Sequence, residues 1–248
     1  MPEQITMTAP EFPLIRPGDN LADIILANMP FVVEDGDIIA LAQKVVSKAE
    51  GRYVALAQVS PSPRAIEIAE VAQKDPRLVE LILAESSEIL RVLPGNVISL
   101  HRKGWIMANA GIDASNIDSD DHVLLLPLDP DASAAGIREV VRRETGRDVG
   151  VLINDSWGRP WRMGSVGFAV GAAGVPALVD MRGKPDLRGR FLQHTDIGIG
   201  DELASAASLL MGQANEGRPM IVLRGFRLAA PAKDAASLIR PAEMDLFR

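Results

Sequence analysis

The stretch that most constrains the fold runs from residue 149 to residue 174, VGVLINDSWGRPWRMGSVGFAVGAAG. Its first residues, 149–153, are apolar and mostly β-branched, which predicts a buried strand. A polar tripeptide, a glycine and a proline follow, and we expect them to end the strand in a loop. Asp155 and Ser156 then place a carboxylate and a hydroxyl at the strand end, close to Arg159. Such a cluster can hold a metal ion against a phosphate, although each residue alone is equally well explained by a polar turn.

Composition narrows the chemistry that such a site can use. The chain of 248 residues has a net charge of −7, so it offers no general basic field for nucleic acid or for an anionic membrane. It has no cysteine, and its three histidines show no spacing typical of metal ligands. Any metal is therefore expected to be a hard cation, Mg²⁺ or Mn²⁺, on oxygen ligands. Without a leader-like start or a long apolar run, we expect a cytoplasmic protein with no membrane contact.

Patterns typical of strands and of helices alternate along the chain without a repeat or a long linker, which predicts a single domain over residues 1–248, with one or two lobes. The two strands around residues 102–104 should form an antiparallel hairpin. The lysine-bearing segment after residue 42 is expected to be a solvated strand end, with lysines that contact a phosphate as the alternative, and the tail from residue 231 is expected to be a helix. Strands are expected at 37–42, 97–100, 105–107, 122–127, 149–153 and 220–224, and helices at 20–27, 63–74, 78–92, 131–146 and 195–211.

Known nucleotide and hydrolase motifs are missing from the sequence. The glycines between residues 164 and 174 match neither G-x-G-x-x-G nor G-x-x-x-x-G-K-[ST], and close backbone packing in a sheet explains them better. No G-x-S-x-G elbow is present. What remains is a dispersed set of oxygen ligands and cations, which fits metal-assisted phosphoryl chemistry but does not separate a kinase, a phosphohydrolase and a ligase. The set comprises Lys44, Lys48, Asp113, Asn116, Asp155, Ser156, Arg159 and Arg162.

Seven motifs, taken in order, resemble a known family. They are VVSKAEGR, NAGIDASN, LPLDPDAS, GVLINDSWGRPWRxG, DLxGR, DELAxAAxLLMG and IVLRG. Over residues 13–225 the chain is similar to the coenzyme F420-0:L-glutamate ligases, or F420 gamma-glutamyl ligases. The resemblance implies GTP-dependent addition of L-glutamate to coenzyme F420-0, extended into a γ-linked tail. It also implies two divalent ions, Mg²⁺ or Mn²⁺, a monovalent ion such as K⁺, and an intertwined homodimer.

The same resemblance implies an α+β subunit of two lobes, with mainly antiparallel sheets and packed helices. Some relatives carry a further nitroreductase-like domain, and we expect none here because the chain ends at Arg248.

Site residues follow from the resemblance by position. The nucleotide would be bound by Pro13, Leu14, Ile15, Arg16, Gln43, Lys44, Lys48, Asn116 and the loop Met211, Gly212, Gln213, Ala214, Asn215, Glu216, Gly217 and Arg218. The metal ligands would be Asp113, Asp155, Ser156 and Gln213. Ser156 stands where threonine is common, and Gln213 where some relatives have glutamate, so Gln213 could ligate only through its amide oxygen.

The expected mechanism needs no nucleophilic side chain. The acceptor carboxylate attacks the γ-phosphate of GTP, and the amine of glutamate displaces phosphate from the acyl phosphate. Lys48 and Arg159 would stabilise charge. Three alternatives stay open: a ligase of the same scaffold with another carboxylate acceptor, a metal-dependent phosphohydrolase, and a nucleotide-binding regulatory module.

Overall fold

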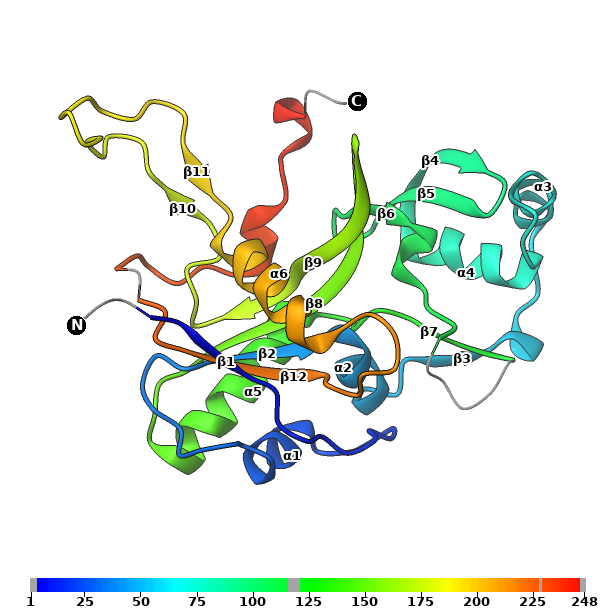
Figure 1. Cartoon of the computed structure of the whole chain (residues 1–248). Helices are drawn as coiled ribbons and strands as arrows, with labels where there is room; N and C mark the ends of the chain where they lie inside the picture. The colour runs from blue at the N-terminus through cyan, green and yellow to red at the C-terminus, as the bar shows by residue number, and fades with distance from the viewer. Residues whose placement is uncertain (1–3, 116–120, 228, 246–248) are drawn as a thin grey trace.

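A five-stranded sheet forms the centre of the protein (Figure 1). The computed structural model describes residues 4–115, 121–227 and 229–245. The strand order is β1-β12-β2-β8-β9, and every neighbouring pair is antiparallel except β2 and β8. This arrangement confirms the predicted α+β class with mainly antiparallel pairing. The strands are β1 (Thr6–Thr8), β2 (Ile38–Ala42), β8 (Gly150–Arg159), β9 (Arg162–Ala173) and β12 (Met220–Arg224).

Helices cover both faces of this sheet, and each face has its own apolar core. Helices α1 (Leu21–Ala27) and α5 (Pro130–Thr145) lie on one face, while α6 (Ile199–Met211) lies on the other (Figure 1). Side chains alternate along the central strands, so that Ile39 belongs to the first core and Ile38 to the second. The short helix α2 (Gln43–Ala49) follows β2 directly and packs on the first core.

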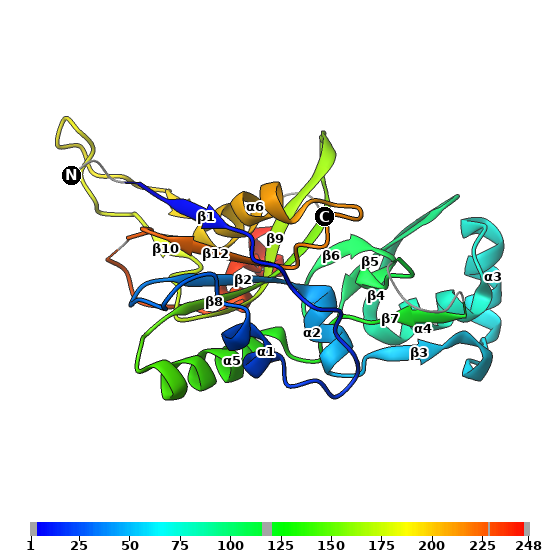
Figure 2. The ribbon, with the colours of Figure 1, turned by 60° about the horizontal axis from the view of Figure 1, so that its bottom comes forward.

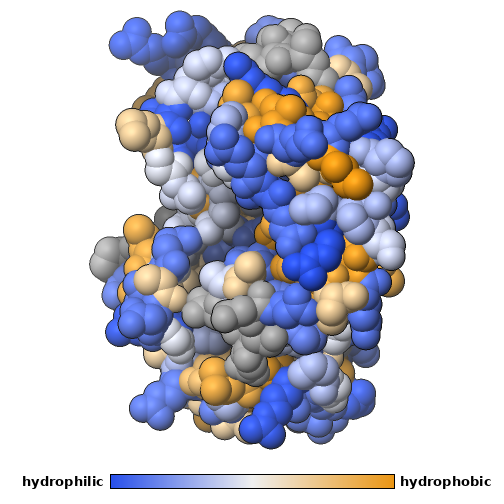
Figure 3. Space-filling view, turned by 90° about the vertical axis from the view of Figure 1, so that its right-hand side faces the viewer, coloured by the Kyte–Doolittle hydropathy of each residue, from blue (hydrophilic) through white to orange (hydrophobic). Residues whose placement is uncertain are grey.

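A small lobe, residues 63–111, lies to one side of the sheet in both ribbon views (Figures 1 and 2). It contains α3 (Pro63–Ala72), α4 (Pro76–Glu85) and the three-stranded sheet β4 (Ser86–Leu93), β5 (Asn96–His101) and β6 (Ile106–Ala108). A separate core that includes Ile82 and Val97 holds it together. The pair β3 (Tyr53–Ala55) and β7 (His122–Leu124) lies beside it, and the surface at this end is hydrophilic with separate apolar spots (Figure 3).

Two hairpins extend from the sheet. Strands β8 and β9 form the longer one, and β10 (Val179–Asp180) with β11 (Asp196–Ile197) forms the base of the other (Figure 1). Within the described part of the chain, none of the helices combines the length and the apolar character that crossing a membrane requires.

Several expected elements need correction. The helix expected over 78–92 ends at Glu85, because the next residues pair with β5 as strand β4, and this pairing outweighs their helical spacing. The helix expected from residue 195 begins at Ile199. As far as the structure describes it, to residue 245, the tail expected to be a helix forms short 3₁₀ turns instead, η3 (Ala235–Leu238) and η4 (Ala242–Met244).

The segments around the expected site differ most from expectation. The lysine-bearing segment after residue 42 is helix α2, not a strand end. Strand β8 also continues through the polar residues that were expected to break it, because β9 pairs with it as far as Arg159. Pro160 falls in the turn between the two strands, where its missing N–H disrupts no ladder.

Gly167 and Gly171 of β9 serve close packing as expected, whereas the expectation was wrong for Gly164, because nothing lies within 4 Å of its Cβ position. A Cβ on Gly171 would lie 2.4 Å from the carbonyl oxygen of Pro130, at the start of α5. One on Gly167 would lie 2.5 Å from the carbonyl oxygen of Ala204 in α6. The helices on both faces can therefore approach β9 only because these positions lack side chains.

Candidate functional site

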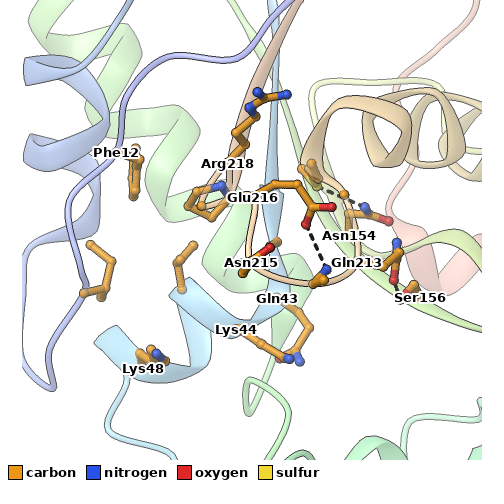
Figure 4. A pocket seen from close by; sticks show the side chains of 18 of the residues that line it. Phe12, Gln43, Lys44, Lys48, Asn154, Ser156, Gln213, Asn215, Glu216 and Arg218 are labelled. Atoms are coloured by element: carbon orange, nitrogen blue, oxygen red, sulfur yellow. Dashed lines mark hydrogen bonds between the residues drawn. The ribbon is translucent and has the colours of Figure 1, made fainter. Parts of the chain in front are cut away.

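A cavity of about 540 Å³ opens where α2, β8 and the loop after α6 meet the N-terminal segment. Figure 4 shows its walls, with Lys44 and Lys48 on the α2 side and Glu216 on the loop. Most of the predicted nucleotide-binding residues line it: Pro13, Leu14, Ile15, Gln43, Lys44, Lys48, Met211, Gly212, Gln213, Ala214, Asn215, Glu216, Gly217 and Arg218. Of the predicted metal ligands, Asp155, Ser156 and Gln213 line the same cavity.

Helix α2 supplies the positive side of the cavity. Lys44 and Lys48 are four residues apart, which places them on the same side of a helix. The opposite side carries Val46, which is buried in the core. The amphipathic pattern of α2 therefore fixes both lysines toward the cavity.

Lys44 also connects the cavity to Asp113, a predicted metal ligand that follows the small lobe. The Nζ atom of Lys44 lies 2.6 Å from Oδ2 of Asp113 and donates a hydrogen bond to the Oγ atom of Ser115 at 2.7 Å. Burial acts to raise the pKa of Asp113, but hydrogen bonds from Lys44 and from the backbone N–H of Ser115 outweigh it, and the pKa lies below its usual value. Asp113 is therefore ionised at neutral pH.

Asp155 behaves in the opposite way. Burial is the main cause that raises its pKa, to about 7; the charge of Asp113 acts in the same direction, and the backbone N–H of Ser156 and the charge of Lys44 act against it. The influence of one carboxylate on the other requires the two to lie near each other, although they are far apart in sequence. Two carboxylates that repel each other in this way favour a shared cation.

Ser156 and Gln213 bring neutral oxygens to the same place. The hydroxyl of Ser156 donates to Oε1 of Gln213 at 2.7 Å, which joins β8 to the loop after α6 (Figure 4). Asn154, buried next to them, uses its Nδ2 atom to donate to Ser208 and Met211, and its buried Oδ1 atom has no partner among the described residues.

The loop after α6 takes its shape from a close approach at Gly212. This residue has φ of +74°, and a Cβ on it would lie 2.1 Å from the side-chain carbon Cδ of Glu216. Glu216 in turn accepts a hydrogen bond from the backbone N–H of Ala214 at 2.8 Å (Figure 4). Only glycine can occupy position 212 with the loop in this conformation.

Three of the predicted site residues that the structure describes are not part of the cavity wall, and one of them, Asp113, is joined to it through Lys44. Arg16 is exposed just outside it, and its N–H donates to Asp19. Arg159 lies at the tip of the β8–β9 hairpin, where its Nη1 atom donates to the carbonyl of Gly164, and its role in charge stabilisation stays a prediction. Asn116 lies outside the described residues.

The cavity also has walls that the sequence did not indicate, including Phe12, Val45 and Asn154. Phe12 and Asn154 each directly precede a predicted site residue, and this adjacency was the only available signal. Val45 gave no such signal, because a valine in this segment is typical of an ordinary core residue.

The donor set fits a hard cation. Carboxylate, hydroxyl and amide oxygens from Asp113, Asp155, Ser156 and Gln213 are ligands of the kind that Mg²⁺ and Mn²⁺ prefer. Within the described ranges no group of three or more histidine, cysteine or acidic residues is placed to hold a metal. A cation here would therefore need the neutral oxygens as well as the two carboxylates.

Comparison with known proteins gives one consistent result. The sequence model of the F420-0:Gamma-glutamyl ligase family matches residues 10–225. The chain is 47% identical over 241 residues to the coenzyme F420:L-glutamate ligase of Methanothermobacter thermautotrophicus, with 95% of each chain covered. It is 48% identical to that of Methanopyrus kandleri, with 94% of this chain and 93% of the relative covered. The chain belongs to the F420-0:gamma-glutamyl ligase family.

Proposed function

We propose that this protein is a ligase that uses GTP to join L-glutamate to coenzyme F420-0, and that it repeats the reaction to build a γ-linked tail. The observation that carries the proposal is the convergence of four chain segments on one cavity. Both lysines of α2 and the oxygens of Asp155, Ser156 and Gln213 face this space. Relatives that are 41–48% identical to it over nearly the whole chain are named coenzyme F420:L-glutamate ligases, which supports the joining of glutamate to this coenzyme.

Charge explains why such a reaction needs this cavity. GTP, the acceptor and glutamate are all anionic, and two like charges about 4 Å apart repel by roughly 4 kcal/mol at an effective dielectric constant of about 20. Lys44 and Lys48 offset part of this repulsion. Divalent cations bound by Asp113, Asp155, Ser156 and Gln213 would neutralise phosphate charge and polarise the γ-phosphate.

The proposed chemistry has two steps. An oxygen of the acceptor carboxylate forms a bond to the γ-phosphorus as the bond to the β,γ-bridging oxygen breaks, which releases GDP. The glutamate nitrogen then forms the amide bond as the acyl carbon–oxygen bond breaks, which releases phosphate, and the ammonium protons pass to solvent. The side chains bind and orient the reactants, and Lys48 faces the developing negative charge.

Mass spectrometry of the products tests the function. The protein is incubated with GTP, Mn²⁺, L-glutamate and coenzyme F420-0, and we expect the acceptor to gain one or more glutamyl groups as GDP forms. Omitting either glutamate or the acceptor should stop GDP formation. Phosphate release without glutamate would instead identify a phosphohydrolase, and turnover with a different carboxylate would identify another acceptor.

Three further properties belong to the proposal. We infer that the enzyme acts in the cytoplasm as an intertwined homodimer and that it binds a monovalent ion such as K⁺ beside two divalent ions. Light scattering with refractive-index detection measures the subunit number. Turnover in matched KCl and tetramethylammonium chloride solutions measures the need for K⁺.

A further inference from the structure

A second cavity, of about 270 Å³, lies beside the β8–β9 hairpin. We call it the aromatic cavity, because its wall includes a stacked pair of rings, Trp157 and Phe168. Their ring centroids are 4.3 Å apart and their planes differ by 9°. Both residues are only half-buried, although aromatic pairs of this kind are usually found in a core.

Strand geometry places this ring pair next to the site described above. Asp155 and Trp157 are two residues apart on β8, so they point to the same face of the hairpin, about 7 Å apart along the strand. Phe168 is the register partner of Asp155 on β9, and it points to that face as well. The rings and the carboxylate therefore share one surface.

A second segment of the chain connects the aromatic cavity to the Asp113–Asp155 pair. Trp105 and Ile106 line the aromatic cavity, and the chain continues from them through β6 to Asp113. On the way, Ala110 is held at φ of +52° and is fully buried, so the path of this segment is fixed by packing. Two independent stretches of chain thus run from the aromatic cavity to the Asp113–Asp155 pair.

The walls of the aromatic cavity are suited to a planar aromatic group with polar edges. Leu238 and Trp105 add apolar surface. The Oδ1 atom of Asp201 accepts a hydrogen bond from the backbone N–H of Ala169. Arg240 also lines the cavity, and it is exposed. Ring surface with a few polar groups is typical of sites for fused heterocycles.

We propose that the aromatic cavity binds the planar heteroaromatic end of the acceptor substrate, and that the acceptor extends from there toward Asp113 and Asp155 with its carboxylate end. This inference rests on the proposed function, because it names where that function's acceptor lies. The nucleotide is bound in the larger cavity, so the two substrates meet at the carboxylate pair.

Binding and kinetics of Phe168→Leu test this assignment. Leucine keeps apolar bulk but removes the ring. We expect the Kd of coenzyme F420-0, measured from its own fluorescence, and its KM to rise roughly tenfold, since loss of one stacking partner has about this effect. The KM of GTP and kcat should stay unchanged. Phe168→Trp should restore acceptor affinity, and saturating GDP should not displace the coenzyme.

Met163→Ala is the matched control, because Met163 is fully exposed on the same strand and lines neither cavity. Unchanged acceptor Kd in Phe168→Leu, with normal product formation, overturns the aromatic subsite and leaves the proposed function intact. A shift in subunit number instead of acceptor affinity also overturns it, because the rings then form an interface between copies. If the wild type binds the coenzyme through Phe168 but makes no product, the proposed function fails and the subsite stands.

Discussion

The Nζ atom of Lys44 lies 2.6 Å from the Oδ2 atom of Asp113, and this ion pair joins helix α2 beside the central sheet to the segment that leaves the small lobe. Neither residue is fully buried, so the pair contributes modestly to stability. Its greater effect is electrostatic, because the ammonium keeps Asp113 ionised at the edge of the candidate site.

Lys44→Met tests the importance of this pair. We expect turnover with GTP to fall at least tenfold, because an anionic reactant loses a cation, while the free energy of unfolding changes by about 1 kcal/mol or less. Steady-state kinetics and urea unfolding measure the two effects. Lys103→Met is the control, because Lys103 forms a similar pair with Asp129 at 2.9 Å, away from the cavity. Equal losses of turnover in both variants would contradict a special role for Lys44.

The raised pKa of Asp155 predicts an unusual pH dependence of the free energy of unfolding. Because its folded pKa of about 7 is above the usual value of 3.8 for an aspartate, the unfolded chain releases this proton at lower pH than the folded protein does. The contribution of Asp155 to the free energy of unfolding is therefore largest below pH 4, and it is lost as pH rises through 7. Mg²⁺ or Mn²⁺ bound at this carboxylate should reverse the loss, so added cation should raise the Tm more at pH 8 than at pH 5.

Asp155→Asn provides the comparison for that measurement. The amide does not titrate and it binds cations weakly, so the difference in Tm between wild type and variant should depend on pH. Carboxylates other than Asp113, whose charge acts on Asp155, affect both proteins alike and cancel in this difference. A cation effect on the Tm of Asp155→Asn equal to that of the wild type would show that the cation binds elsewhere.

Gly212→Ala should change nucleotide binding without unfolding the protein. The new Cβ would overlap the side chain of Glu216, so this side chain must move and lose its hydrogen bond from the N–H of Ala214. Since this hydrogen bond lies within the loop after α6, the KM of GTP should rise several-fold. Gly217→Ala separates this overlap from backbone strain: Gly217 also has positive φ, at +67°, but nothing lies within 4 Å of its Cβ position. Both variants should lose about 1 kcal/mol of stability from strain. Similar KM values in the two would contradict the role of the overlap.

Sequence patterns predicted correctly those helices and strands for which the local sequence and the tertiary contacts favour the same structure. Helix α1 (Leu21–Ala27) lies within the range expected for it, 20–27, and the hairpin β5–β6 turns at the expected residues. The prediction failed where tertiary contacts decide. Ser86 and the residues after it have helical spacing yet form β4, because β5 offers backbone partners that no local pattern reveals. The sequence likewise placed a loop where β8 continues, since the pairing of β9 is not visible from β8 alone.

In the candidate site too, motifs along the chain predicted some features, and tertiary contacts decided the others. Family motifs predicted the nucleotide and metal residues, and the structure brings nearly all of those that it describes to one cavity. The proximity of Asp113 and Asp155 depends on how the small lobe folds back, which spacing along the chain does not encode. The aromatic pair was equally invisible, because Trp157 and Phe168 meet only through the register of β8 with β9.

Asn154 gives a last prediction, about the support of the site. Its amide donates to Oγ of Ser208 at 3.0 Å and to Sδ of Met211 at 3.3 Å, and so it holds the end of α6, from which the nucleotide loop begins. Asn154→Ala should lower the free energy of unfolding by about 1–3 kcal/mol and raise the KM of GTP, because the loop loses its anchor. A double-mutant cycle with Ser208→Ala, followed by urea unfolding, isolates the hydrogen bond; additive effects of the two changes would show that it contributes nothing.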